Sequence, residues 1–259
     1  MTARAGGSAG LAVADDLYGD PDLAQFYDLE NGWAADFDHC RGLAAAGAAV
    51  LDLGCGTGLF AATLAAEQGC RAVGVDPAAA MLDIARGRPG GDRVRWIVGD
   101  ARTLRLDERF DLVVLTGHAF QVFLTPDDRA AALGTIARHL APGGRFVFDS
   151  RNPALGKWRG WTPDRSRRSI DHPRLGRVDA WNDVTEDAAT GIVTYDSFYE
   201  IAATGRRLAS RSQIAFPGRD EIATLVDDAG LAVESWLGDW TGAPWTPASP
   251  EIIPVGRLR

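Results

Sequence analysis

Short runs of β-branched and other apolar residues alternate, from Val50 onward, with Ala- and Leu-rich stretches of helical length. This alternation is typical of βαβ units, in which parallel strands form one sheet and helices cover its faces. Five strands are expected, over residues 49–53, 71–76, 94–98, 110–116 and 145–149. Helices are expected over residues 59–68, 78–86 and 126–140, each closed by Gly or Pro soon after its last turn. The pattern therefore predicts an α/β fold with a doubly wound, mainly parallel sheet.

The segments on either side of this pattern differ from it. Upstream, residues 22–46 favour helix interrupted near Asn31, beside the carboxyl edge of the sheet. Downstream, residues 151–173 lack periodicity, and the strands then expected are antiparallel, over 178–184, 192–201 and 208–216. A helix over 219–229 and strands over 231–237 and 252–258 follow, and these strands could join the edge of the main sheet. We predict four units, namely a disordered tail over 1–14, a helical segment over 15–47, an α/β core over 48–152 and 218–259, and an antiparallel β insertion over 153–217.

The composition limits the class of protein and of partner. With 46% hydrophobic and 24% charged residues among 259, the chain has the composition of an ordered globular protein. No apolar run approaches the ~20 residues needed to span a bilayer, so no membrane partner is expected. A net charge of -8 argues against a nucleic-acid partner, because that affinity rests on clustered Lys and Arg. An odd number of cysteines and no targeting signal predict a reduced, cytoplasmic setting.

Three glycines at alternate positions, Gly54, Gly56 and Gly58, stand between the first strand and the first helix of the pattern. Glycine turns tightly with positive φ and leaves the backbone accessible to a ligand, and the helix start offers free N–H groups. A nucleotide-like ligand is therefore expected, with a tight turn that binds nothing as the alternative. The dinucleotide fingerprint G-x-G-x-x-G fails, because Leu59 stands where its third glycine belongs. Asp52, two residues before the loop, suits a ligand that carries an ammonium.

Carboxylates follow the next two strands at the same edge of the sheet. Asp76 ends the second strand, where it can accept hydrogen bonds from both hydroxyls of a ribose. Asp100 and Ala101 follow the third strand, where the carboxylate and the adjacent N–H can read an adenine amino group and ring nitrogen. Either aspartate alone could be a surface residue that caps a turn. Spaced together at consecutive strand ends, they predict a nucleoside site.

Residues 50–152 resemble the class I S-adenosylmethionine-dependent methyltransferases. The resemblance rests on LDLGCGTG at 51–58, VGVDP at 73–77 with Met81, VGDA at 98–101, FDLVV at 110–114 and LAPGGRF at 140–146. It implies a Rossmann-like methyltransferase fold with S-adenosyl-L-methionine as the cofactor. It also implies that Asp52 and the loop carbonyls surround the methionyl amino group, that Asp76 binds the ribose, and that Asp100 and Ala101 read the adenine. The other predicted cofactor contacts are Tyr27, Pro77, Met81 and Thr116.

The two ends of the chain look like the small-molecule branch of that family. In that branch an N-terminal helix covers the cofactor, and an antiparallel insertion after the fifth strand roofs the acceptor. The resemblance therefore implies that residues 15–47 are a lid and residues 153–217 a roof. The candidate lid aromatics are Tyr18, Phe26, Tyr27 and Trp33. Alternatively, these aromatics only anchor a helix to the core.

His118 follows the fourth strand, at the edge where the acceptor is expected. The ordinary pKa of histidine, ~6.5, suits removal of a proton from a hydroxyl or an ammonium. His118 is therefore the predicted catalytic residue. The alternatives are that it orients the acceptor, packs on the cofactor or has a structural role. His139, near a helix C-terminus, is expected to be structural.

The acceptor site is predicted from residues near the same edge. The predicted contacts are Trp33, His118, Arg151, Asn152 and Trp158. Six of the eight tryptophans follow residue 150, and with interleaved arginines they could line a pocket for an aromatic or anionic molecule. Alternatively, a thin insertion with little aliphatic core uses tryptophan as its filling. No metal is predicted, because Ser150 and Arg151 stand between Asp149 and Asn152 at the end of the fifth strand.

These observations predict a methyltransferase that uses S-adenosylmethionine and acts on O or N of a small-molecule acceptor by direct displacement. Two other functions remain open, a nicotinamide-dependent oxidoreductase of the same fold and a cofactor-binding module without catalysis. A nucleic-acid substrate is not expected, because residues 116–119 lack the Asp/Asn-Pro-Pro-aromatic sequence of base-methylating enzymes. The oligomeric state is left open between monomer and homodimer.

Overall fold

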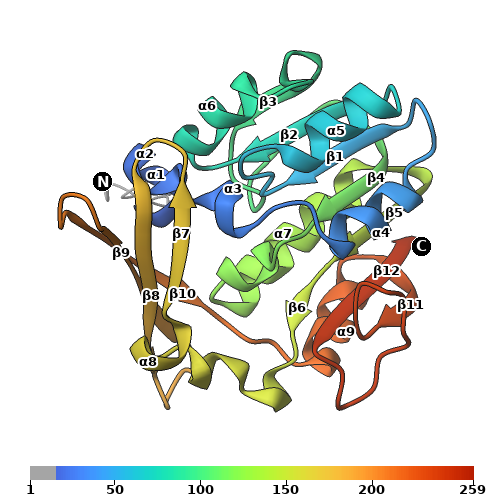
Figure 1. The fold of residues 1–259 in the computed structure, drawn as a ribbon. Helices are drawn as coiled ribbons and strands as arrows, with labels where there is room; N and C mark the ends of the chain where they lie inside the picture. Colours follow the sequence, from blue (N-terminus) through green and yellow to red (C-terminus); the bar gives the residue numbers. More distant parts are fainter. Residues whose placement is uncertain (1–15) are drawn as a thin grey trace, which may run out of the picture.

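The computed structural model describes residues 16–259, so the tail predicted over 1–14 lies outside the described residues. The main sheet follows the predicted α/β pattern (Figure 1). Its parallel strands are β1 (Ala49–Leu53), β2 (Arg71–Asp76), β3 (Arg95–Val98), β4 (Phe110–Leu115) and β5 (Leu140–Phe148). At one edge, β11 (Leu231–Leu237) and β12 (Glu251–Leu258) run antiparallel, and β12 pairs with β5 and with the short β6 (Ser150–Arg151). The order across the sheet is β11-β12-β5-β4-β1-β2-β3.

The order of the parallel strands reverses between β1 and β4. From β1 the chain moves to β2 and β3 on one side of the sheet, and it then returns to β4 and β5 on the other side. In doubly wound sheets, ligands bind beyond the carboxyl ends of the strands at such a switch point. The glycine loop follows β1 and His118 follows β4, so both stand at this position.

Helices cover both faces of the main sheet. They are α4 (Ala35–Leu43), α5 (Leu59–Glu67), α6 (Ala79–Gly87), α7 (Pro126–His139) and α9 (Arg219–Asp228). α4 and α5 form one apolar core with Val50 and Val114. α7 and α9 form another with Leu51 and Val113, which alternate with the first pair along the same strands. Both faces of the central strands are therefore buried, as parallel sheets require.

The remaining elements lie before β1 and after β5. The N-terminal helices are α1 (Asp16–Gly19), α2 (Pro21–Ala24) and α3 (Tyr27–Glu30). The helical structure is interrupted after Asn31, before α4 begins. Short helical turns are η1 (Gly91–Arg93), η2 (Ala119–Val122), η3 (Pro153–Leu155), η4 (Lys157–Gly160) and α8 (Pro163–Ser166). No helix among residues 16–259 combines the length and the apolar character that a membrane crossing needs.

A second, antiparallel sheet stands apart from the main sheet (Figure 1). Its order is β10 (Arg207–Ile214), β9 (Val193–Ile201), β8 (Gly176–Glu186) and β7 (Arg168–His172). The strand β7 lies in the segment for which the sequence predicts no periodic structure. It is only five residues long and buries only Ile170 and His172, so its alternation is too brief to stand out.

The antiparallel sheet shares an apolar core with the N-terminal helices. Phe26 is fully buried there and stacks on Tyr199 with ring centroids 4.4 Å apart. Leu23, Ile170 and Val178 complete the contact between the two segments. We call the helices α1 to α4 the lid and the sheet β7 to β10 the roof; α1 to α3 of the lid are attached to the roof through this core.

Candidate functional site

A cavity of about 1330 Å³ opens at the switch point, walled by the main sheet, the lid and the roof. Ligand pockets commonly measure ~300–1,000 Å³, so this cavity has room for a cofactor and a second molecule. The predicted site residues that line it are Tyr27, Trp33, Gly54, Gly56, Asp76, Pro77, Met81, Asp100, Ala101, Thr116, His118 and Arg151. The predicted site residues outside its wall are Asp52, Gly58, Asn152 and Trp158.

The glycine loop lines the cavity next to the end of β1. Gly54 and Gly56 have φ values of +65° and +53°, a region that glycine adopts without strain. A Cβ on Gly54 would stand 3.1 Å from the Cβ of Ala119, and one on Gly56 would stand 3.6 Å from the ring of Tyr27. The bare backbone keeps open a cradle that side chains would fill. These residues therefore fit the cofactor that the resemblance implies.

Gly58 serves the packing of α5 rather than the cavity. It has φ +74° at the start of the helix, and a Cβ there would stand 2.3 Å from the ring of Trp96. The third glycine of the loop is thus required by the close approach of Trp96 on β3, and its contact with the cofactor stays a prediction.

Asp52 also lies behind the loop instead of in the cavity wall. Its side chain points from the centre of β1 and is only 3% exposed. Burial, together with the nearby Asp76, raises the pKa of Asp52 to about 8. Burial therefore favours the neutral form of this carboxyl group, and the contact of Asp52 with a methionyl ammonium stays a prediction.

Asp76 stands at the position where a carboxylate that binds a ribose is expected. Its Oδ2 accepts a hydrogen bond from the N–H of Gly56 at 2.9 Å, and its Oδ1 accepts one from the N–H of Ala78 at 2.8 Å. Burial raises the pKa of Asp76, and the two amide hydrogen bonds oppose this. A carboxylate has about four lone-pair sites, so two remain for hydroxyl groups in the cavity.

Asp100 lines the cavity but is bound by a residue that the sequence did not indicate. Arg102 donates hydrogen bonds to both carboxylate oxygens of Asp100 at 2.6–3.0 Å. It donates a further hydrogen bond to the carboxylate of Asp128 at 2.7 Å. Burial raises the pKa of Asp100, but the hydrogen bonds from Arg102 outweigh it and hold the pKa below its ordinary value. Asp100 thus stays charged, with little capacity left for an adenine amino group.

The lid aromatics divide into two roles. Tyr18, Tyr27 and Trp33 line the cavity. Phe26 instead packs inside the lid–roof core, which matches the anchoring alternative. Burial and the nearby carboxylate of Asp76 raise the pKa of Tyr27, so its hydroxyl stays protonated as a hydrogen-bond donor beside the glycine loop.

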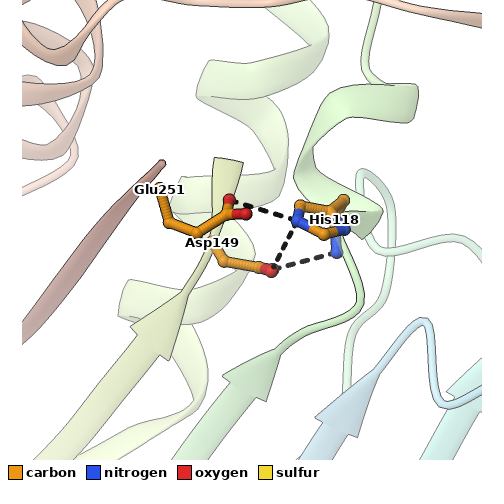
Figure 2. Close-up of side chains that lie close together, drawn as sticks. All are labelled: His118, Asp149 and Glu251. Carbon is orange, nitrogen blue, oxygen red and sulfur yellow. Dashed lines mark hydrogen bonds and ion pairs between the residues drawn. The ribbon is translucent and has the colours of Figure 1, made fainter. Parts of the chain in front are cut away.

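His118 has the one positive φ of a non-glycine residue within 16–259, at 62°. Its N–H donates to Oδ1 of Asp149 at 3.0 Å. Its ring Nε2 lies 3.1 Å from Oε2 of Glu251 and 3.4 Å from Oδ2 of Asp149, as Figure 2 shows. These three side chains offer atoms within 4.8 Å of one another, close enough to share a cation, although the sequence predicts no metal.

The predicted acceptor contacts after β5 separate in the structure. Arg151 reaches the cavity, where its guanidinium bonds Oε1 of Gln121 at 3.0 Å and lies over the ring of Trp161. Asn152 turns away, because its amide donates to the carbonyls of Pro247 and Ser249. Trp158 is buried against Phe216 with ring centroids 4.1 Å apart, so it fills the roof as the alternative supposed.

Two acidic residues near His118 were missed by sequence reasoning. Asp36, on α4, lines the cavity, and its Oδ1 is buried without a hydrogen-bond partner among residues 16–259. Burial raises the pKa of Asp36, and the charge of His118 lowers it. Glu251 comes from β12, 133 residues after His118. Neither belongs to a local motif, so no sequence signal points to them.

Comparison with known proteins supports the methyltransferase interpretation. A family model described as a methyltransferase domain matches residues 50–144. The chain is 34% identical over 209 residues to the cypemycin N-terminal methyltransferase of a Streptomyces species, a match that covers 81% of this chain and 82% of that protein. Its fold resembles the CcbJ methyltransferase from Streptomyces caelestis, with a TM-score of 0.72, 22% identity and coverage of 93% and 97%. It also resembles the sugar N-methyltransferase KedS8 from Streptoalloteichus, with a TM-score of 0.73, 20% identity and coverage of 99% of both chains. The structural likenesses confirm the predicted fold class.

Proposed function

Because the chain belongs to the S-adenosylmethionine-dependent methyltransferases, we propose that it methylates an amine nitrogen of a small, polar molecule. The cofactor supplies an activated methyl group on a sulfonium. Gly54, Gly56, Asp76, Pro77 and Met81 would hold it at the carboxyl edge of the sheet. The nicotinamide-dependent alternative is set aside, since both the family and the missing third glycine of the dinucleotide fingerprint speak against it.

The pairing of His118 with Asp36, whose Oδ1 has no hydrogen-bond partner among residues 16–259, carries the proposal for nitrogen. An aliphatic amine is an ammonium at neutral pH, and it must lose a proton before its lone pair can attack. Asp36 offers a buried, unpartnered oxygen in the cavity wall, which suits a cation. His118 lines the same cavity and can accept the proton. An alcohol would need the base but not the carboxylate.

The lid and roof supply alignment and exclude water, which is most of what a direct displacement requires. Tyr27 and Trp33 line the cavity from the lid side. The name of the 34% identical relative, an N-terminal methyltransferase, is consistent with an amine acceptor.

The roof indicates that the acceptor is polar. Asn182, Ser197, Ser212 and Gln213 line the cavity from β8 to β10. Ser212 is only 3% exposed, and its Oγ has no hydrogen-bond partner among the described residues. A buried hydroxyl without a partner costs about 1–3 kcal/mol, so an acceptor with hydroxyl or carbonyl groups binds here better than an apolar one.

The test is turnover with isotopically labelled cofactor on matched pairs of acceptors. Amino sugars and peptide N-termini would be compared with the corresponding alcohols, and the products identified by mass spectrometry. We expect the amines to gain the labelled methyl group. Methylation of the alcohols but not of the amines would contradict the choice of nitrogen.

The variant Asp36→Asn tests the ammonium site directly. Hydrogen bonds to charged groups contribute about 1.5–3 kcal/mol, so we expect the KM of the amine to rise about 10-fold or more while the Kd of the cofactor stays the same. The matched control is Asp83→Asn, whose side chain is 75% exposed on α6. A change in the Kd of the cofactor, with the KM of the amine unchanged, would mean that Asp36 binds the cofactor and not the acceptor.

A further inference from the structure

We propose that Glu251 is a positioning residue, which with Asp149 fixes the His118 imidazole so that Nδ1 is the atom that accepts the acceptor's proton. The inference rests on the proposed function, in which His118 is the base. It assigns a role to a strand at the opposite end of the chain from the cofactor loop.

The contacts of the ring determine which nitrogen carries hydrogen. Nε2 lies 3.1 Å from the Glu251 carboxylate and 3.4 Å from that of Asp149. Ionised carboxylates only accept hydrogen bonds, so Nε2 is the protonated nitrogen of the neutral imidazole. Nδ1 then keeps its lone pair. No hydrogen bond of Nδ1 is found among residues 16–259, and His118 lines the cavity in which the acceptor is expected.

Asp149 hydrogen-bonds the main chain of His118, and its Oδ2 lies 3.4 Å from the ring Nε2 without a hydrogen bond to it. The side chain of Asp149 is 1% exposed, and its Oδ1 accepts the His118 N–H at 3.0 Å. This hydrogen bond supports a φ of 62°, which is unfavourable for a non-glycine residue unless the surroundings fix it. Asp149 therefore holds the backbone of His118, and Glu251 holds its ring.

The sheet brings Glu251 to this place. β12 runs antiparallel to β6, with Glu251 opposite Arg151 and Ile252 opposite Ser150. Glu251 thus begins its strand beside the end of β5, next to Asp149. The Glu251 side chain is 18% exposed and lies outside the cavity wall, so it acts through His118 and not on the acceptor.

The proton balance is simple. The N–H bond of the ammonium breaks, a bond to Nδ1 forms, and the electron pair stays on the amine nitrogen. The imidazolium that results keeps its Nε2–H between two carboxylates, which favour its charge. The charged groups that face or adjoin the ring are Asp36 on α4, Asp149 after β5, Arg151 in β6 and Glu251 on β12.

The experiment is a double-mutant cycle on kcat with whichever acceptor the enzyme turns over. We expect Glu251→Gln to lower kcat by about 10-fold or more, within the ~10²–10⁴ that a general base contributes, with KM little changed. In a His118→Gln background the same substitution should have no further effect. Glu234→Gln, on the neighbouring strand β11 and paired with arginines, is the matched control that should leave kcat unchanged.

Nitrogen-15 NMR of the His118 ring gives a readout that a merely structural role would not change. We expect a protonated Nε2 and an unprotonated Nδ1 in the wild type, and a mixture of tautomers in Glu251→Gln. Additive losses of kcat in the cycle, or a protonated Nδ1 in the wild type, would overturn the inference. So would stoichiometric binding of Mn²⁺ or Zn²⁺ with loss of activity in a chelator, since Nε2 would then be a metal ligand. If alcohols and not amines are methylated, the choice of nitrogen fails while the cycle still reports on Glu251.

Discussion

Asp52 shows how burial changes the titration of a single residue of the glycine-loop motif. Its carboxyl group lies inside the sheet, where burial and the neighbouring Asp76 raise its pKa to about 8. The unfolded value is near ~3.9, so the folded protein binds this proton more tightly than the unfolded chain does. The contribution of Asp52 to the free energy of unfolding therefore falls as the pH rises from about 4 to about 8.

The variant Asp52→Asn removes this dependence. Without cofactor, we expect the variant to be more stable than the wild type at pH 8 by on the order of a few kcal/mol, since one pKa unit corresponds to ~1.4 kcal/mol. This gain in stability should shrink as the pH falls toward 5. Urea unfolding at the two pH values measures it, with the exposed Asp83→Asn as the control. A gain that is the same at both pH values would refute the burial argument.

Other residues show which contacts a sequence can reveal. Gly54, Gly56 and Asp76 could be predicted to lie at the cavity, because each belongs to a motif that local spacing defines, and all three line it. Glu251 and Asp36 were not found, because their relation to His118 exists only after strands and helices far apart in the sequence have packed. The hydrogen bonds of Asn152 could not be predicted for a similar reason, since its partners are carbonyls about 95 residues away.

At the scale of elements, the start of α5 depends on the space that Gly58 leaves for Trp96. Gly58 has φ +74°, and a Cβ would stand 2.3 Å from the indole and 2.8 Å from the Cβ of Ala85. Trp96 in turn donates from Nε1 to the carbonyl of Gly91 at 2.8 Å, so the ring is held in place and is not free to move aside.

We expect Gly58→Ala to lower the free energy of unfolding by about 1–3 kcal/mol, through overpacking and an unfavourable φ. Gly87→Ala is the matched control at the end of α6, where a Cβ meets nothing within 4 Å, and it should be neutral or slightly stabilising. Thermal unfolding of both variants decides the matter. Equal changes in stability for the two variants would mean that Trp96 moves aside to make room for the added Cβ.

The main strands were predictable because each is a buried run of apolar residues closed by a turn. The observed β1 and β2 have the predicted bounds. β5 extends back to Leu140, five residues earlier than predicted, because Leu140 pairs with Phe110 across an irregularity that no periodicity reveals. β7 was missed because only Ile170 and His172 of its five residues are buried, so that, unlike β1, it has no apolar run and is defined by its pairing with β8.

At the scale of the whole molecule, Phe26 connects the lid to the roof. It is fully buried between Tyr199 and His172, with ring centroids 4.4 and 5.4 Å away. The adjoining Glu30 accepts a hydrogen bond from the Tyr199 hydroxyl at 2.6 Å and pairs with Arg168. This wall of the cavity is therefore built jointly by Glu30 from the N-terminal helices and by Arg168 and Tyr199 from the antiparallel sheet.

We expect Phe26→Ala to destabilise the protein by about 3–5 kcal/mol, the usual cost of removing a buried phenyl ring. Leu29→Ala, three residues later and 43% exposed, should change stability by no more than ~0.5 kcal/mol. Denaturant titration compares the two. A loss near zero for Phe26→Ala would show that the lid does not depend on the roof for its stability.

The shared core of lid and roof also limits how this enzyme can be recombined. The roof contributes Asn182, Ser197, Ser212 and Gln213 to the cavity wall, so under the proposed function residues 153–217 are the segment to exchange between relatives when a new specificity is sought. Its underside, however, is shaped to Leu23 and Phe26. A chimera that receives the roof of a relative must therefore also receive that relative's counterpart of residues 16–31. Two segments that are far apart in the chain would have to be exchanged together.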